Sequence, residues 1–147
     1  MIAPREFKLV YAEDDDLFRA AVIAMLHQAG VRVHPCSDGA KAVELCETMR
    51  PDAALFDLDM PGMDGFEAAR RLRRNPALLG MRLVALTGRG TLEFRMRAVD
   101  VCFDQFLCKP VAREALLQAL HMGAHVAAHG SCGAFRPQPA HRSPNQS

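Results

Sequence analysis

Residues 53–65 read AALFDLDMPGMDG, and this short stretch contains a complete structural unit. The four apolar residues 53–56 are typical of a buried strand, and residues 57–63 carry the aspartates, proline and glycine of a turn. Asp64 suits the N-cap of a helix that continues to residue 74. The stretch therefore predicts a buried strand that leads through a polar turn into a helix.

The same alternation of strand and helix runs along most of the chain. Short apolar runs predict five strands, and apolar residues at helical spacing predict the helices that follow them. We expect strands at 7–12, 31–33, 53–56, 82–86 and 103–107, and helices at 17–29, 39–49, 65–74, 91–99 and 111–122. Such βα units predict an α/β three-layer sandwich, with a parallel sheet, right-handed connections and helices on both faces.

The composition is that of an ordinary globular domain. The chain has 147 residues, 50% of them hydrophobic, so a single domain with a full core fits its length. We assign a leader to residues 1–6, one domain to residues 7–122, and a disordered tail, rich in Ala, Gly, His, Pro and Ser, to residues 123–147. A net charge of +1 gives no argument for nucleic acid or an anionic membrane as a partner.

The sequence carries no sign of export or of membrane insertion. No apolar run approaches the roughly 20 residues of a membrane span, and the N-terminus lacks the apolar stretch of a signal peptide. The five cysteines are scattered, with no Cys-x-x-Cys pair, which is typical of reduced thiols. We therefore expect a cytoplasmic protein.

Polar side chains fall at the points where four of the predicted strands end. Glu13 and Asp14 follow the first strand, Asp57 ends the third, Thr87 ends the fourth and Lys109 ends the fifth. The carboxyl ends of parallel strands share one edge of the sheet, where open α/β folds bind ligands. We therefore expect these chain-distant residues to converge on one site.

The chemistry of this set is that of phosphoryl transfer. Carboxylates brought together repel each other unless a cation joins them, and an oxygen-only cluster with few protein ligands suits Mg²⁺. A carboxylate such as Asp57 can accept a phosphoryl group, while Lys109 and Thr87 supply a positive charge and a hydroxyl donor to its oxygens. No general base is needed, because positioning and charge neutralisation dominate this reaction.

Four motifs resemble those of the response-regulator receiver domains of two-component (His-Asp) phosphorelay systems. They are LVYAEDD at 9–15, LFDLDMPGMDG at 55–65, LTG at 86–88 and FLCKP at 106–110. The resemblance covers about residues 7–122. It implies a flavodoxin-like (βα)5 fold whose five-stranded parallel sheet has the order 2-1-3-4-5.

The resemblance also implies an acceptor and a metal site. Asp57 would be the phospho-acceptor. Mg²⁺ would be bound by Asp14, by Asp57 and by the backbone carbonyl of Asp59, with Glu13 as the partner of Asp14. Glu13 stands where Asp is commoner in the family, and it is a known alternative there.

Further roles follow for the last two motifs. Thr87 and Lys109 would contact the phosphoryl group, Thr87 and Phe106 would form the switch pair, and the Lys109–Pro110 peptide would be cis. Phe106 replaces the more frequent Tyr, so its ring can move but cannot donate a hydrogen bond. Cys102 stands where Gly is usual, which leaves the local turn open.

As for partners, the resemblance implies a histidine kinase or a histidine phosphotransfer protein as phosphodonor and a protein target downstream. A phosphorylation-dependent homodimer is also compatible with it. The chain would be a signalling domain, not an enzyme, and would catalyse only its own phosphorylation and dephosphorylation. We expect no output domain in it, so that it is either a stand-alone regulator or the receiver of a hybrid kinase.

Other interpretations stand beside these. A haloacid-dehalogenase-like phosphatase also uses an Asp-x-Asp motif, but its acidic pair follows the lysine in the chain, whereas here the pair is at 13–14. A degenerate receiver would serve only as a binding module. Phe106 could be an ordinary core residue. Arginines 70, 71, 73 and 74 indicate a solvated helix end more than a nucleic-acid patch, and histidines 121, 125 and 129 indicate a metal site only weakly.

Overall fold

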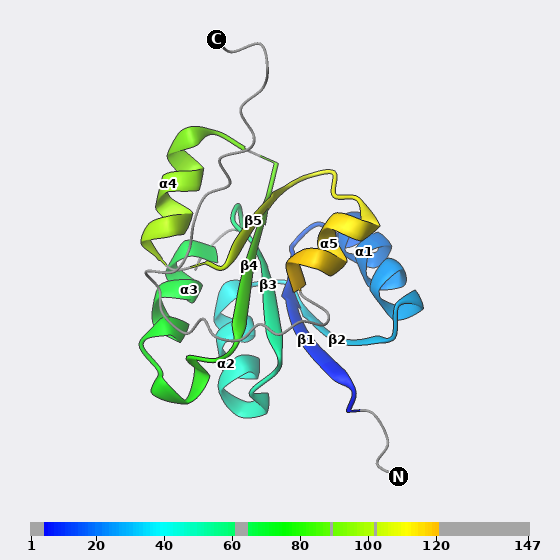
Figure 1. Cartoon of the computed structure of the whole chain (residues 1–147), viewed down its shortest axis with the longest axis horizontal. Coiled ribbons are helices and arrows are strands. Elements are labelled where there is room, and N and C mark those ends of the chain that lie inside the picture. The colour runs from blue at the N-terminus through cyan, green and yellow to red at the C-terminus, as the bar shows by residue number, and fades with distance from the viewer. Residues whose placement is uncertain (1–4, 61–64, 89, 102, 121–147) are drawn as a thin grey trace.

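The computed structural model describes residues 5–60, 65–88, 90–101 and 103–120, which form one parallel sheet with helices on both sides (Figure 1). The strands are β1 (Phe7–Ala12), β2 (Val31–Cys36), β3 (Ala53–Asp57), β4 (Arg82–Thr87) and β5 (Gln105–Cys108). The helices are α1 (Asp16–Gln28), α2 (Gly39–Met49), α3 (Gly65–Arg73), α4 (Leu92–Asp100), α5 (Arg113–Leu120) and the short 3-10 helix η1 (Pro76–Leu78). The strand order is β2-β1-β3-β4-β5, so the predicted flavodoxin-like fold is confirmed.

Alternation along the central strands divides the core between the two faces of the sheet. Val10 and Ala12 of β1 pack with α2, α3 and α4, whereas Leu9 and Tyr11 pack with α1 and α5. Successive strand residues point to opposite faces, so a strand covered on both sides is apolar along its covered length, as β3 is from Ala53 to Phe56. Figure 1 shows α1 and α5 on one side of the sheet, and α2, α3 and α4 on the other.

Polar side chains at the helix starts fix where several helices begin. The Asp15 carboxylate accepts hydrogen bonds from the backbone N–H groups of Leu17 and Phe18, and caps α1. Asp38 caps α2, and Thr91 caps α4. Each cap satisfies a backbone donor that has no partner inside its helix.

Some predicted element boundaries were wrong. β2 continues to Cys36 through Pro35, which an edge strand tolerates because it has no second neighbour that needs a backbone N–H. β5 begins at Gln105, although Phe103 before it is fully buried. The helix η1 was not predicted. The fifth helix was predicted to span 111–122 and is observed at Arg113–Leu120, and residues 121 and 122 lie outside the described part.

Several predictions fall on residues that the structure does not describe. These are the Asp64 cap, the turn at Cys102, most of the leader, the three C-terminal histidines and the disordered tail. Among the described helices, none is long and apolar enough to cross a membrane.

Candidate functional site

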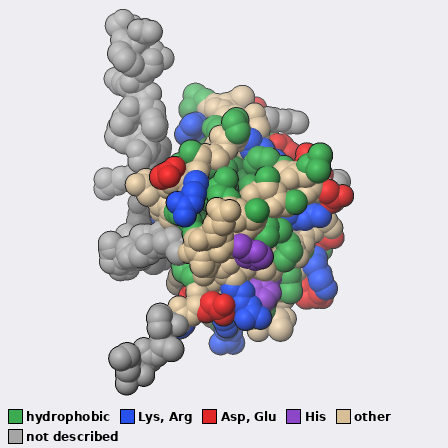
Figure 2. All heavy atoms as spheres, turned by 90° about the vertical axis from the view of Figure 1, so that its right-hand side faces the viewer, with side chains coloured by type: hydrophobic (Ala, Val, Ile, Leu, Met, Phe, Trp, Pro, Cys, Tyr) green, Lys and Arg blue, Asp and Glu red, His purple; other side chains and the backbone are tan. Residues whose placement is uncertain are grey.

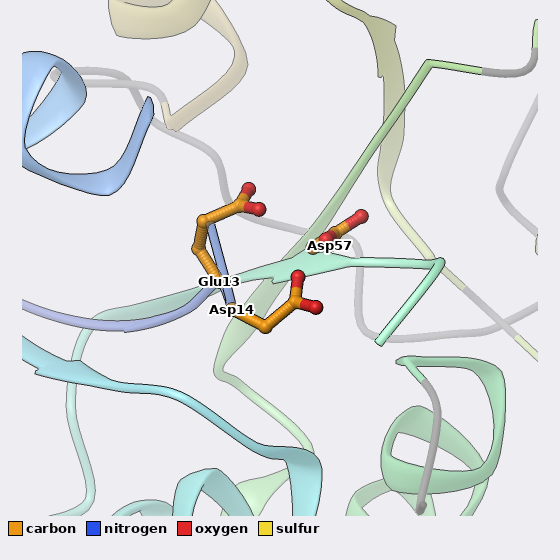
Figure 3. Close-up of side chains that lie close together, drawn as sticks. All are labelled: Glu13, Asp14 and Asp57. Carbon is orange, nitrogen blue, oxygen red and sulfur yellow. The ribbon is translucent and has the colours of Figure 1, made fainter. Parts of the chain in front are cut away.

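The carboxyl ends of two neighbouring strands bring three carboxylates together. Glu13 and Asp14 come directly after β1, and Asp57 is the last residue of β3, beside β1 in the sheet. Each of the three offers one oxygen, and these oxygens all lie within 4.8 Å of one another (Figure 3). Glu13 and Asp57 are buried, with 0% and 2% of their surface exposed, whereas Asp14 is exposed. The cluster is therefore closed on the protein side and open to solvent at Asp14.

Asp57 lies in a pocket that disfavours its charge. Burial, followed by the neighbouring Glu13 carboxylate, raises the pKa of Asp57 to about 7, although the Asp59 backbone N–H and Lys109 act in the opposite direction. That N–H donates to Asp57 Oδ1 at 3.0 Å. A side chain at Gly65 would come within 2.8 Å of the Asp57 carbonyl oxygen, so glycine lets α3 begin directly against the end of β3.

Lys109 is the cation that faces this cluster. Its Nζ lies 3.1 Å from Glu13 Oε1, 3.2 Å from Glu13 Oε2 and 3.6 Å from Asp57 Oδ2. Its backbone N–H donates to the Thr87 carbonyl at 2.7 Å, which joins the chain just after β5 to the end of β4 at this edge. The Lys109–Pro110 peptide is cis, as the resemblance implied.

Thr87 is buried at the end of β4 and faces the same site. Its hydroxyl donates to the Asp59 carboxylate at 3.1 Å, and Asp59 itself is exposed. Phe106 lies on β5 in register with Ala85, is half-buried, and packs its ring against the guanidinium of Arg95 at 5.0 Å. Thr87 therefore joins the site directly, while Phe106 lies two residue pairs away from Thr87 along the β4–β5 ladder.

The donor set fits the predicted magnesium ion. Among the described residues, the ammonium group of Lys109 lies against three clustered carboxylates, and the repulsion from Glu13 adds to burial in raising the pKa of Asp57. All the available ligand atoms are oxygens, and the exposed side leaves room for water, both of which Mg²⁺ prefers. Glu13, Asp14 and Asp57 are the residues that could hold it. The contribution of the Asp59 carbonyl stays a prediction.

Three residues at the site were not predicted from the sequence. Tyr11 lies in β1, two residues before Glu13, so strand alternation places it on the same side of the chain as Glu13. Its hydroxyl is fully buried and makes no hydrogen bond of ordinary geometry among the described residues. Burial, then the Glu13 and Asp57 carboxylates, raises the pKa of Tyr11. Arg19 donates to the Glu13 carbonyl at 2.6 Å, and the ring of Phe18 lies 4.6 Å from Lys109 Nζ. Strand alternation could have indicated Tyr11, but no local pattern links α1 to residue 109.

Comparison with known proteins identifies the class of this domain. The profile of the response regulator receiver domain matches residues 9–121, and the chain therefore belongs to that family. The matching family is thus that of receivers and not that of haloacid-dehalogenase-like proteins. The acidic cluster, Thr87 and Lys109 lie together at one edge of the sheet.

The individual relatives include a response regulator and a histidine kinase. The chain is 34% identical over 110 residues to the response regulator MprA of Mycobacterium leprae, matching 75% of this chain and 47% of that protein. It is 30% identical over 129 residues to the probable histidine kinase 2 of Oryza sativa subsp. japonica, matching 77% of this chain and 12% of that protein. The chain thus spans half or less of these relatives.

Solved structures agree in fold. The chemotaxis protein CheY4 of Vibrio cholerae is 28% identical, with a TM-score of 0.74 over 79% of this chain and 97% of its own. The receiver domain of the sensor histidine kinase PA1611 of Pseudomonas aeruginosa PAO1 is 29% identical, also with a TM-score of 0.74, over 79% of this chain and 95% of its own. That structure contains a magnesium ion coordinated in its active-site cleft.

Proposed function

We propose that this receiver domain accepts a phosphoryl group on Asp57, in a magnesium-dependent reaction, from a histidine kinase or a histidine phosphotransfer protein. One observation carries the proposal. Asp57 is buried at the end of β3 between two further carboxylates and the ammonium group of Lys109. The magnesium ion in the PA1611 receiver supports the same chemistry here.

The chain's own residues account for the transfer. The phosphorus–nitrogen bond of the donor phosphohistidine breaks, a bond forms between phosphorus and an Asp57 oxygen, and the donor imidazole keeps the electron pair. Lys109 is already 3.6 Å from Asp57 and can neutralise a phosphoryl oxygen. Mg²⁺ bound at Glu13, Asp14 and Asp57 would supply the remaining positive charge. Hydrolysis of the acyl phosphate later returns Asp57, so the domain acts on itself and not on a separate substrate.

Phosphorylation would be read out through Thr87 and Phe106. A phosphoryl oxygen competes with Asp59 for the Thr87 hydroxyl, and movement of Thr87 makes space toward which the Phe106 ring can turn. The surface formed by α4, β5 and α5 would then differ between the two states and bind a protein partner or a second copy. Because kinases draw on ATP, we place the domain in the cytoplasm.

The test is direct phosphorylation by a small donor. Acetyl phosphate with Mg²⁺ should add the mass of one phosphoryl group, as acetate leaves, and Asp57→Asn should abolish the adduct. Asp38→Asn is the matched control, because Asn also caps helices well and Asp38 caps α2 outside the acidic cluster. An adduct that persists in Asp57→Asn, or that forms in the presence of a chelator, would contradict the proposal.

A further inference from the structure

The ring of Phe18 lies against the ammonium group of Lys109. The distance from Lys109 Nζ to the ring centroid is 4.6 Å, well inside the range in which an aromatic face attracts a cation. Phe18 belongs to the first turn of α1, whereas Lys109 follows β5. The contact therefore joins two elements that are far apart in the sequence, at the edge of the sheet where the acidic cluster lies.

Phe18 is itself held firmly. Its backbone N–H donates to the Asp15 carboxylate at 3.0 Å, which fixes the first turn of α1. Its side chain is half-buried and packs against the core between the sheet, α1 and α5. The ring is thus a fixed surface, while Lys109 carries a flexible four-carbon chain with 23% of its side chain exposed.

The other contacts of Lys109 are with groups that change during the proposed reaction. Its ammonium group is 3.1 Å from Glu13 Oε1 and 3.6 Å from Asp57 Oδ2. A metal ion would share the charge of both carboxylates, and phosphorylation would convert Asp57 into an acyl phosphate. The ring keeps its attraction for the ammonium group through each of these changes, because it takes no part in them.

We propose that Phe18 is a positioning residue that holds Lys109 in place for the phosphoryl group; this inference rests on the function proposed above. The ring restricts the lysine to a few conformations and excludes water from one side of the ammonium group. Less conformational freedom is then lost when Lys109 binds a phosphoryl oxygen. A contact of this strength corresponds to about a two- to fivefold effect on affinity.

Beryllofluoride, a phosphoryl mimic, tests the inference when it is titrated at saturating Mg²⁺ and followed by NMR. Phe18→Leu keeps an apolar side chain without the ring and should weaken binding about two- to fivefold. Phe18→Tyr keeps the ring and should stay within about twofold of wild type, as should Met25→Leu, a half-buried control in the same helix and core. The Lys109 ε-methylene protons should also lose their upfield ring-current shift in Phe18→Leu and keep it in Phe18→Tyr.

Repeating the Phe18→Leu substitution in a variant that lacks the lysine separates an effect on Lys109 from an effect on general packing. In Lys109→Gln, Phe18→Leu should cause no further loss of affinity, because the ring no longer has a cation to hold. Equal loss in both backgrounds, equal affinities of Phe18→Leu and Phe18→Tyr, or an unchanged Lys109 methylene shift would each overturn the inference. Failure of the wild-type chain to bind beryllofluoride would instead overturn the proposed function.

Discussion

Asp57 illustrates how a single residue combines burial with unfavourable charge. Its pKa of about 7 in the absence of a metal ion lies well above the usual value near 4, and burial is the main cause. The pKa is higher in the folded chain than in the unfolded chain, so ionised Asp57 opposes folding. This opposition is absent below about pH 4, grows between pH 4 and 7, and is complete above pH 7.

A stability measurement without Mg²⁺ should reveal this opposition. The free energy of unfolding of Asp57→Asn should exceed that of wild type, and the excess should grow by on the order of 2–3 kcal/mol between pH 5 and pH 8. Urea unfolding at each pH measures it. Saturating Mg²⁺ should stabilise wild type and not the variant, which reduces the difference. A difference in unfolding free energy that does not depend on pH would show that neighbouring groups already offset the cost of burying the Asp57 charge.

A hydrogen bond between Thr87 and Asp59 should oppose the proposed switch. The hydrogen bond from Thr87 to the Asp59 carboxylate, at 3.1 Å, must break before Thr87 can donate to a phosphoryl oxygen. A net hydrogen bond contributes about 0.5–1.5 kcal/mol, so its removal should tighten beryllofluoride binding roughly two- to tenfold. Asp59→Ala should show this gain, and Asp59→Asn, which keeps an acceptor oxygen, a smaller one. Unchanged or weaker binding in Asp59→Ala would mean that the bond does not oppose the switch.

At the scale of elements, α1 presents an apolar outer face. Val22 and Leu26 are buried against the sheet, yet Leu17 is 84% exposed and Ala20 and Ala24 are exposed as well. Figure 2 looks at the side of the molecule that carries α1 and α5, and hydrophobic side chains gather over it. The apolar face of α1 is therefore wider than the core needs, and we expect the phosphodonor to dock there.

Charge introduced on this face should separate docking from chemistry. Ala20→Glu or Ala24→Glu should slow transfer from the cognate kinase about tenfold, since burying an uncompensated charge at a contact costs more than 1.4 kcal/mol. Labelling by acetyl phosphate should not change. Ala40→Glu on α2, also exposed, is the matched control. Equal losses with both donors would indicate damage to the fold.

The sequence predicted which segments form helices and strands better than it predicted where those segments begin and end, for physical reasons. The run before Lys109 was assigned to a strand from residue 103 because Phe103 is apolar, but apolar character reports burial and not ladder pairing. The site was predictable because its residues all stand at strand ends, which meet at one edge. The contact between Thr87 and Asp59 and that between Phe18 and Lys109 depend on side-chain conformations across distant segments, which no local pattern encodes.

For the whole molecule, the proposed switch predicts changes far from the pocket. Moving a two-state equilibrium from about 1:99 to 99:1 requires about 5.5 kcal/mol of differential binding. Beryllofluoride with Mg²⁺ should therefore perturb NMR signals across residues 90–108, through α4 and β5. In Thr87→Ala the pocket signals should still shift and the distant ones should not. Perturbations confined to the pocket of the wild-type chain would argue against a switch.

Tyr11 gives the domain an optical property of its own. The chain contains one tyrosine and no tryptophan, and that tyrosine is buried in β1 beside the acidic cluster. Nearly all the ultraviolet emission of the protein therefore arises next to its metal and phosphoryl site. Any ion or phosphodonor that changes the charge near Glu13 changes the surroundings of this one fluorophore, so the native chain reports on its own occupancy without a label.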